Sequence, residues 1–326
     1  MPTTPAATVL SIGETLIDLI ASDGATRLED VASFAARPGG APANVVVALA
    51  RLGVPSAFCG VVGDDPFGGR LRTTLRSAGV DVSRLRSTGD ADTTVAFAWK
   101  DARGDGHFRL LRMADRLISD ADVDAAGVES MSALVVGSVA LAADPSRAAV
   151  TRAVALAAAA GVPVCFDINV RPTLWPDRDA AFAACLPVLK AATLLKLSLD
   201  DARYLFDPEM EAVGALLHAQ GFGARFTVLT DGARGAWWTV RDDPPPADRR
   251  FIPAFAVEAV DPTGAGDAFT AALISRLIAA GWRGLGRDDV EFASAAGALT
   301  TTRRGAMEAL PDLADIRAFL DAQRSR

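Results

Sequence analysis

From about residue 130 onward, short uninterrupted apolar runs alternate with longer stretches in which apolar residues recur at helical spacing. The runs predict strands that are buried on both faces, as the strands of a parallel sheet are. These strands are Ala133–Val139, Val162–Ile168, Thr193–Leu197 and Phe226–Leu229. The helices predicted between them are Ser146–Ala160, Ala180–Lys190 and Glu209–Gln220. This alternation is typical of βαβ units and predicts an α/β fold in which helices cover a mainly parallel sheet.

The first third of the chain has a different pattern. Its strand-like segments, Leu16–Ile20, Thr93–Lys100 and His107–Arg112, contain polar residues among the apolar ones. Residues 101–106 contain two glycines and two aspartates and predict a turn between the last two segments. Strands with one wet face indicate a small sheet that is separate from the parallel one.

The composition excludes several classes of protein. The 326 residues carry a net charge of −7, which disfavours nucleic-acid binding because that requires a basic face. The length would allow two domains, but no internal repeat or low-complexity linker divides the chain, so we expect one domain over residues 1–326. Residues 242–248 (DDPPPAD) predict a surface loop within it. The chain has neither a membrane-spanning apolar run nor a recognisable signal peptide, which predicts a cytoplasmic protein that does not bind membranes.

Cysteine and histidine are too few for several common kinds of site. Cys59, Cys165 and Cys185 lie singly in apolar runs, so we expect buried thiols without disulfides. His107 and His218 are the only histidines, which leaves little for a zinc cluster or a Ser-His-Asp triad. The sequence also lacks a Walker A loop and a GxGxxG turn after a strand, so it does not bind nucleotides through those motifs.

Residues 261–273 (DPTGAGDAFTAAL) carry the strongest chemical signal. Gly264 and Gly266 bracket a turn that leads into a helix near Asp267, and apolar residues then recur at helical spacing as far as Gly281. Glycines allow the backbone to approach a ligand closely, and the first N–H groups of a helix attract anions. Asp267 is therefore either a helix cap or a base that accepts a proton from an attacking hydroxyl beside a bound phosphoryl group. The two glycines, which a cap does not require, favour the base, and the helix start is expected to keep its pKa low.

This motif resembles the second signature of the ribokinase (PfkB) family of sugar and nucleoside kinases. Residues 39–53 (GGAPANVVVALARLG), followed by residues 58–68 (FCGVVGDDPFG), resemble the first signature. The two signatures lie about 220 residues apart in the expected order, and the resemblance extends from Ile12 to about Pro311. It implies a ribokinase-like three-layer sandwich with a small β lid, formed by segments near residues 14–37 and 90–116. It also implies that Asp267 is the catalytic base and that the N–H groups of Gly264, Ala265 and Gly266 hold the transferring phosphoryl group.

The resemblance also implies a sugar site. Its residues are Asp18, Gly39, Gly40, Asn44, Arg112, Asp167, Asn169 and Arg171. Asp18 is expected at the end of the first strand region. Residues 167–175 (DINVRPTLW) leave a buried strand at its carboxyl end, where open α/β sheets bind ligands, and they resemble fructokinases and 2-keto-3-deoxygluconate kinases.

For the nucleotide and its ions, the resemblance implies three groups of residues. Those that bind ATP are Lys196, Ser198, Thr230, Gly232, Gly235 and Gly266. Asp201 stands where the family has a glutamate that organises magnesium through water. The backbone cage for a monovalent cation consists of Asp261, Thr263, Thr300, Arg303 and Gly305. Residues 293–305 predict a helix of small residues that ends at Gly305 and either admits an adenine or permits close helix packing, with Ala293 in place of the family's usual asparagine.

Taken together, these features predict an enzyme that uses ATP to phosphorylate the terminal hydroxymethyl group of a sugar. Fructose is the preferred substrate, with ATP, magnesium and potassium as cofactors. A 2-keto-3-deoxygluconate kinase stays open because Arg112 and Arg171 would suit a carboxylate. A catalytically inactive sugar-sensing protein is disfavoured by the intact Asp267 motif. Lid strands in this family often pair into dimers, so the resemblance leaves a homodimer through the lid strands open.

Overall fold

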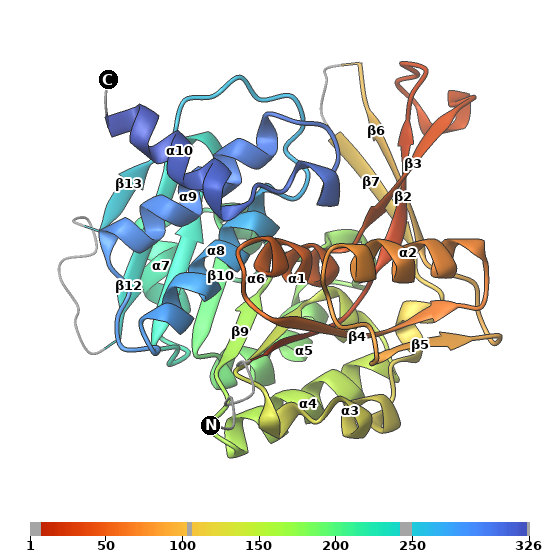
Figure 1. The fold of residues 1–326 in the computed structure, drawn as a ribbon, viewed down its shortest axis with the longest axis horizontal. Coiled ribbons are helices and arrows are strands. Elements are labelled where there is room, and N and C mark those ends of the chain that lie inside the picture. The colour runs from red at the N-terminus through yellow and green to blue at the C-terminus, as the bar shows by residue number, and fades with distance from the viewer. Residues whose placement is uncertain (1–7, 103–105, 242–249, 325–326) are drawn as a thin grey trace.

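A nine-stranded sheet forms the centre of the protein (Figure 1). The computed structural model describes residues 8–102, 106–241 and 250–324. The strand order is β13-β12-β11-β10-β9-β8-β1-β4-β5, and β12 runs antiparallel to both of its neighbours in an otherwise parallel sheet. The strands are β1 (Val9–Ile12), β4 (Ser56–Gly63), β5 (Leu85–Thr88), β8 (Ala133–Gly137), β9 (Val164–Asp167), β10 (Leu194–Ser198), β11 (Phe226–Thr230), β12 (Gly235–Val240) and β13 (Phe251–Pro253).

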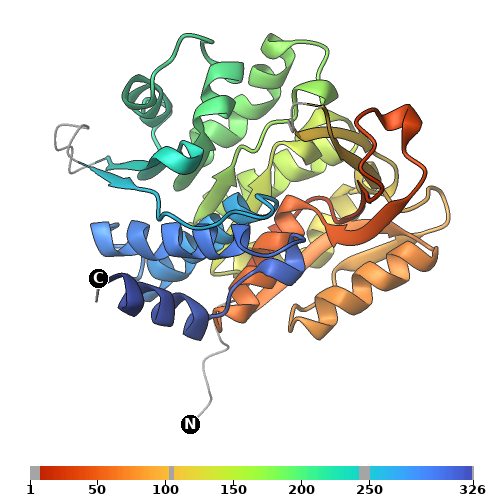
Figure 2. The same ribbon diagram turned by 90° about the horizontal axis from the view of Figure 1, so that it is seen from above.

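Helices cover both faces of this sheet (Figure 2). One face carries α1 (Ala41–Arg51), α2 (Pro66–Ser77), α8 (Ala265–Ala279), α9 (Arg287–Thr301) and α10 (Leu313–Arg324). The other carries α3 (Asp120–Ala126), α4 (Ser146–Ala159), α5 (Arg178–Ala191), α6 (Leu199–Leu205) and α7 (Ala212–Gln220). Successive residues of a strand point to opposite faces, so Val9 belongs to the first apolar core and Leu10 to the second. Burial on both faces is why these strands read as continuous apolar runs.

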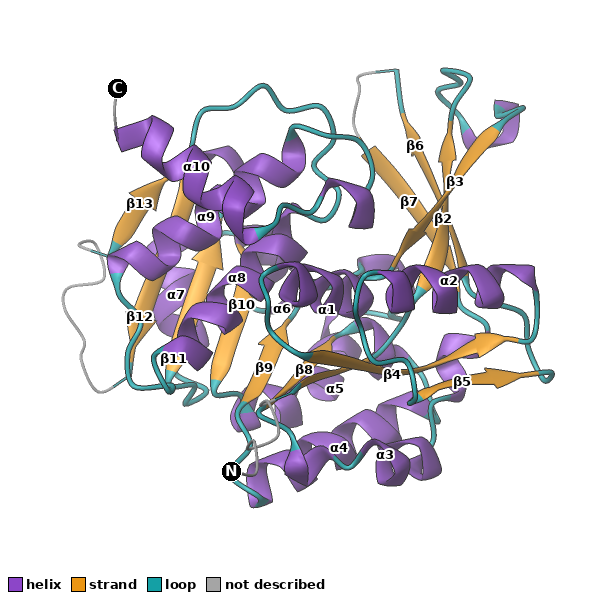
Figure 3. Ribbon diagram, in the orientation of Figure 1, coloured by secondary structure: helices purple, strands orange, loops and turns teal. Residues whose placement is uncertain are grey.

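A second, four-stranded sheet projects from the main body (Figure 3). Its order is β3-β2-β6-β7, with β2 (Leu16–Ala21), β3 (Phe34–Gly39), β6 (Val95–Lys100) and β7 (Gly106–Leu111). Only residues 13–15 separate the end of β1 from the start of β2. The chain therefore passes directly from the carboxyl edge of the main sheet into the small sheet, and the residues of this connection lie at the junction of the two.

The predicted α/β fold and the separate small sheet are confirmed, with strand and helix ends shifted by a few residues. Two predicted positions are wrong. The helix expected over residues 293–305 runs instead from Arg287 to Thr301, and Gly305 lies in the irregular turn beyond it. Asp18 lies in the middle of β2, because β1 and β2 are separate strands in different sheets. The loop at residues 242–248 and residues 103–105 of the predicted turn lie outside the described residues.

The three cysteines are free and buried, as predicted. Burial raises the pKa of each thiol well above its ordinary value, so none is poised to act as a thiolate. Within the described ranges, no helix has the length and apolar character needed to span a bilayer.

Candidate active site

A cavity of about 380 Å³ lies where the carboxyl ends of β1, β9 and β10 meet the small sheet and the start of α8. The predicted site residues that line it are Asp18, Gly40, Asn44, Asn169, Arg171, Lys196, Thr263, Gly264, Gly266 and Asp267. The predicted residues that do not line it are Gly39, Arg112, Asp167, Ser198, Asp201, Thr230, Gly232, Gly235, Asp261, Ala265, Thr300, Arg303 and Gly305. Both sequence signatures thus contribute to one cavity.

Asp267 lies in the first turn of α8, with its side chain buried in the wall of the cavity. It does not cap the helix, since the N-cap position is Gly264 and no side chain caps it. Its Oδ2 accepts a hydrogen bond from the side-chain amide of Asn44 at 2.7 Å. The expected low pKa is wrong: burial raises the pKa of Asp267 to about 6, with a further contribution from Asp167, and the Asn44 hydrogen bond offsets only part of this.

The two glycines of the motif have separate steric roles. Gly264 adopts a positive φ of 82°, which side chains rarely tolerate. A Cβ on Gly266 would lie 3.2 Å from the ammonium nitrogen of Lys196, so a glycine allows that cation to approach the start of α8. The N–H of Ala265 is already donated to the carbonyl of Pro262 at 3.2 Å. No described residue accepts from the N–H groups of Gly266 or Asp267, so these two groups are available to an anion.

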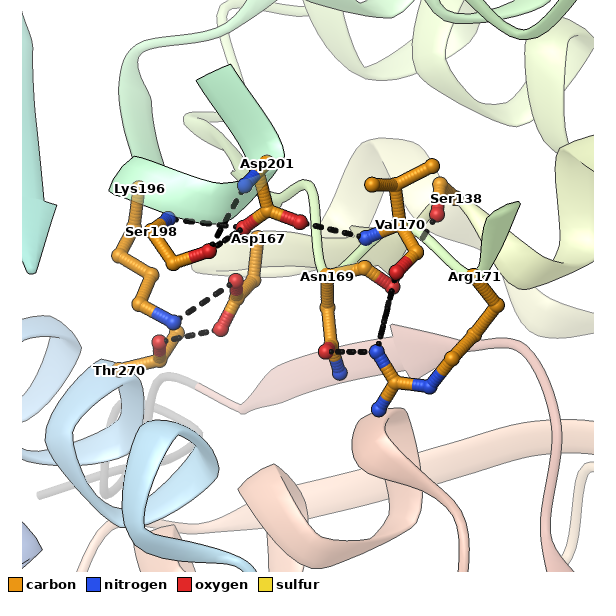
Figure 4. A network of polar contacts seen from close by, with 9 residues as sticks. All are labelled: Ser138, Asp167, Asn169, Val170, Arg171, Lys196, Ser198, Asp201 and Thr270. Carbon is orange, nitrogen blue, oxygen red and sulfur yellow. Dashed lines mark hydrogen bonds and ion pairs between the residues drawn. The ribbon is translucent and has the colours of Figure 1, made fainter. Parts of the chain in front are cut away.

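Lys196 and Asp167 form a buried ion pair beneath the cavity (Figure 4). Asp167 accepts from the Lys196 ammonium at 3.1 Å through Oδ1 and from the Thr270 hydroxyl at 2.6 Å through Oδ2. Burial alone would lower the pKa of Lys196, but the acidic groups around it, Asp167 first and then Asp201 and Asp267, together raise that pKa. Lys196 therefore brings a full positive charge to the cavity, while both oxygens of Asp167 are engaged below it.

Asp201 is saturated with hydrogen bonds (Figure 4). Its Oδ2 accepts from the backbone N–H and the hydroxyl of Ser198, each at 2.7 Å, and its Oδ1 accepts from the N–H of Val170 at 2.7 Å. Asp201 and Ser198 together form the capping box of α6. This arrangement fastens the segment after β9 to the start of α6, and it does not fit a direct role for Asp201 as a magnesium ligand.

The two predicted arginines differ in their access to the cavity. Arg171 lines it, lies over the ring of Phe108 from β7 at 5.7 Å, and donates to the side-chain oxygen of Asn169 at 2.6 Å. Arg112 lies outside the lining, where its side chain is 6% exposed and pairs with Asp115 at 2.6 Å. A carboxylate in the cavity would therefore meet Arg171 directly but not Arg112.

Two acidic residues, Asp18 and Glu14, line the cavity on the side of the small sheet. Burial raises the pKa of Asp18 to about 7, with Asp267 as a further contributor and Arg171 opposing. The carboxyl group of Asp18 lies over Gly39, which leaves room for it by having no Cβ. Glu14, in the connection between β1 and β2, also lines the cavity although the sequence did not single it out. Its position directly after a buried strand was the available signal.

The remaining lining residues that the sequence did not assign are apolar. They are Leu16, Ala41, Leu110, Val139 and Pro262, with the aromatic ring of Phe108 beside Arg171. Leu110 and Phe108 belong to β7, so the small sheet contributes part of the cavity wall. The positions of Phe108 and Leu110 in a strand do not by themselves indicate a binding site. Only the packing of the two sheets brings these side chains to the cavity.

The predicted nucleotide turn lies beside the cavity, at the same edge of the sheet. Thr230 ends β11 and pairs in register with Ser198 at the end of β10. Gly232 and Gly235 form the tight turn into β12, which is closed by the N–H of Asp231 donating to the Gly235 carbonyl at 2.9 Å. Ala293 is fully buried in α9, and a Cβ on Gly297 would lie 3.2 Å from the Ala265 carbonyl. The small residues of α9 thus serve close packing against α8.

The residues of the predicted cation cage lie on two segments that hydrogen bonds join. Asp261 accepts from the Thr263 hydroxyl at 2.6 Å and from the N–H of Gly305 at 3.0 Å. Burial opposes ionisation, but these hydrogen bonds lower the pKa of Asp261 below its ordinary value. Thr300 is fully buried, whereas the Arg303 side chain is exposed, so only the backbone of Arg303 is suited to such a cage. In the described part of the chain, no cluster of three or more His, Cys, Asp or Glu side chains is arranged to hold a metal.

The chain is similar in sequence and fold to proteins described as carbohydrate kinases. A family model described as "pfkB family carbohydrate kinase" matches residues 6–313. Fructokinase-2 of Zea mays is 36% identical over 313 residues, which cover 94% of this chain and 92% of the relative. Fructokinase-2 of Oryza sativa subsp. japonica is 34% identical, over 94% of this chain and 91% of its own.

Solved structures give the same result. The fructokinase of Vibrio cholerae O395, in its fructose, ADP and calcium ion bound form, has a TM-score of 0.84 and 32% identity, covering 97% of this chain and 99% of that one. The ATP-bound fructokinase of Xylella fastidiosa has a TM-score of 0.85 and 30% identity over the same shares. With both signatures converging on one cavity, the chain belongs to the pfkB family of carbohydrate kinases.

Proposed function

We propose that this protein transfers the γ-phosphoryl group of ATP to the terminal hydroxymethyl group of fructose. The observation that carries the proposal is the position of Asp267: a buried carboxylate in the cavity wall, beside two free N–H groups and the Lys196 ammonium. Base, anion site and cation thus face the same space. Relatives named fructokinases, one of them with fructose and ADP bound, support fructose as the acceptor.

Asp267 would accept the proton of the sugar hydroxyl as that oxygen attacks phosphorus. Its pKa of about 6 keeps it ionised at neutral pH while leaving it more basic than an ordinary aspartate, which suits general base catalysis. The Asn44 amide holds Oδ2, so Oδ1 is the oxygen that is free to face the substrate. Proton transfer can be late in a loose, in-line phosphoryl transfer, so positioning of the hydroxyl is the main contribution.

The N–H groups of Gly266 and Asp267 would hold the equatorial oxygens of the transferring group, with the Lys196 ammonium alongside. Asp167 would act through Lys196, by fixing its position and keeping it charged, and would not contact the sugar. From there the nucleotide would extend along the sheet edge past Ser198 toward the turn that holds Thr230, Gly232 and Gly235.

Magnesium would be held by phosphate oxygens and water, and when bound it neutralises charge on the phosphates. Asp201 would influence it only by fixing the loop that precedes α6. Potassium would occupy a cage of backbone carbonyls on residues 261–263 and 300–305, which the Asp261 hydrogen bonds hold together. The small sheet would cover the sugar as a lid, and its strands would be the surface through which two copies form a homodimer.

A 2-keto-3-deoxygluconate kinase is the second candidate, and Arg171 in the cavity lining is the observation that favours it. Against it, Arg112 is outside the lining and paired with Asp115, so only one arginine faces the substrate. A protein that only senses sugar is less favoured, because it would not need a partly free, basic carboxylate at Asp267.

Coupled ADP release from ATP, measured over a panel of ketoses, aldoses and sugar acids, tests the proposal. Fructose should give the highest kcat/KM, and nuclear magnetic resonance of the product should place the phosphoryl group on a terminal hydroxymethyl oxygen. Sugar binding without any ADP release would instead support the sensing protein.

A further inference from the structure

Glu14 is a buried acidic residue in the cavity wall that the proposed mechanism does not use. It lies in the connection between the two sheets, is 3% exposed, and lines the cavity. No described residue forms a hydrogen bond with its Oε2. A buried carboxyl oxygen without a partner is unfavourable unless a ligand supplies one. Glu14 therefore lies in the cavity wall with hydrogen-bonding capacity that the described residues do not use.

The charged groups around Glu14 place it away from the reacting end of the cavity. Besides its burial, those that act most strongly on it are Asp115, Arg112 and Arg171. Asp18, four residues further along in β2, is instead influenced by Arg171 and by Asp267. Glu14 is thus nearer to Arg112 and Asp115, and Asp18 is nearer to the proposed base.

The environment also determines the charge of Glu14. Burial raises the pKa of Glu14 to about 8, and the nearby Asp115 adds to this while the two arginines oppose it. At neutral pH the group is mainly a neutral carboxylic acid, which can both donate and accept a hydrogen bond. A sugar hydroxyl has the same two abilities. A substrate carboxylate at this end would instead have to lie beside an acidic group in a poorly solvated wall.

The two arginines offset this only in part. Arg112 lies outside the cavity lining, with its Nε on Asp115 and its Nη2 3.3 Å from the Ser146 hydroxyl, while its buried Nη1 has no partner among the described residues. The Nη1 of Arg171 is held by the side chain and carbonyl of Asn169 and by the carbonyl of Val170. Arg171 still faces the cavity, and Glu14 is the acidic group that a substrate carboxylate would meet on the same side.

We propose that Glu14 binds a hydroxyl of the sugar at the end opposite Asp267 and selects against substrates that carry a carboxylate there. This rests on the proposed sugar kinase activity and adds a specificity residue to it. Glu14 takes no part in phosphoryl transfer, so its removal should act on KM and on the choice of sugar much more than on kcat.

The variants Glu14→Met and Glu14→Gln test the proposal. Methionine keeps the volume without a hydrogen bond and should raise the KM for fructose roughly 5- to 100-fold with kcat changed less than about three-fold. It should also raise the ratio of kcat/KM for 2-keto-3-deoxygluconate to that for fructose at least ten-fold. Glutamine keeps a neutral donor and acceptor, so the rise in the KM for fructose should be at least five-fold smaller in Glu14→Gln than in Glu14→Met. A KM within two-fold of wild type in Glu14→Met, or equal losses in the two variants, would overturn the proposal.

A series of monodeoxy analogues of fructose identifies the hydroxyl. With the wild-type protein, the kcat/KM of one analogue should fall below that of fructose by the same factor by which Glu14→Met lowers the kcat/KM for fructose. With Glu14→Met, the kcat/KM of this analogue should be little lower than with wild type, because the same hydrogen bond is already absent. If the kcat/KM of every analogue, relative to that of fructose, is the same in both proteins, Glu14 does not bind a hydroxyl. Absence of ADP release by the wild-type protein with every sugar would overturn both the proposed kinase activity and the proposed role of Glu14. Thermal melting of Glu14→Met should be at or above that of wild type, because a buried unpartnered carboxyl has been removed.

Discussion

The carboxyl groups in the cavity wall differ from those in the layer beneath it. In the layer beneath, Asp167 and Asp201 each use both oxygens in hydrogen bonds to the protein. In the wall, Glu14 has an oxygen with no partner in the described chain, and Asp267 is held through one oxygen only. Saturated carboxylates fix the positions of other groups. Carboxyl groups with a free oxygen are the ones available to a substrate.

The strongest test of this distinction is Asp267→Asn. The change removes a base from the wall while keeping the Asn44 contact sterically possible, and it should lower kcat by roughly 10² to 10⁴. Sugar affinity, measured by calorimetry, should stay within a few-fold. Asp122→Asn is the matched control, because Asp122 is also a buried carboxylate but pairs with Arg86 far from the cavity. A turnover near wild type in Asp267→Asn would remove Asp267 as the base.

Removal of the Lys196 charge should have the next largest effect. Lys196→Met takes a charge away from the start of α8 and leaves Asp167 buried without its partner, which should cost about 3–5 kcal/mol of stability in urea unfolding. The kcat/KM for ATP should fall at least about 10²-fold because the anion site loses its cation. The double variant Asp167→Asn with Lys196→Met should recover stability without recovering activity. Recovery of both would mean that Lys196 serves only the fold.

How much of this was predictable depends on whether a feature is local. The parallel sheet was predicted because its strands are apolar on both faces, and the small sheet because polar residues interrupt its strands. The chemistry at Asp267 was suggested by glycines that a cap does not need. Its pKa was predicted in the wrong direction, because helix position is local whereas its burial comes from the packing of α8 against α1.

Other features depend on side-chain partners that no spacing specifies. Arg112 was expected in the sugar site, but its pairing with Asp115 keeps it outside the lining. Glu14 was not selected, because its free oxygen is apparent only once the two sheets meet. The end of α9 was placed at Gly305, because the sequence offers a glycine there, while the helix ends at Thr301 so that its last carbonyl can accept from the N–H groups of Val260 and Asp261.

The buried carboxyl groups of the cavity wall should also make the stability of the protein depend on pH. Folding raises the pKa of Glu14 from 4.5 to about 8 and that of Asp18 from 3.8 to about 7, so the folded protein binds both protons more tightly than the unfolded chain. Their contribution is fully present below about pH 4 and is lost as pH rises through 7 to 8. Substitution of Glu14 by glutamine should therefore reduce the decline in unfolding free energy between pH 5 and 8 by roughly 1–3 kcal/mol. An unchanged decline would show that Glu14 titrates normally.

Potassium should have the smallest effect, a few-fold increase in kcat over tetramethylammonium at matched ionic strength. The reason is that a cation held by residues 261–263 and 300–305 would steady the turn that precedes Gly264 without contacting the reacting atoms. Asp261→Asn weakens the hydrogen bonds that join the two segments and should reduce the increase. Equal kcat in the two salts would remove the cation site.

The most direct measurement of the account is the ratio of kcat/KM for fructose to that for 2-keto-3-deoxygluconate in the wild-type protein. A wall of carboxyl groups with free oxygens accepts hydroxyls and disfavours a substrate carboxylate, so the ratio should exceed roughly ten, or about 1.4 kcal/mol of discrimination. A ratio below one would contradict this account, because the substrate would then be recognised by an arginine and not by the carboxyl groups of the wall.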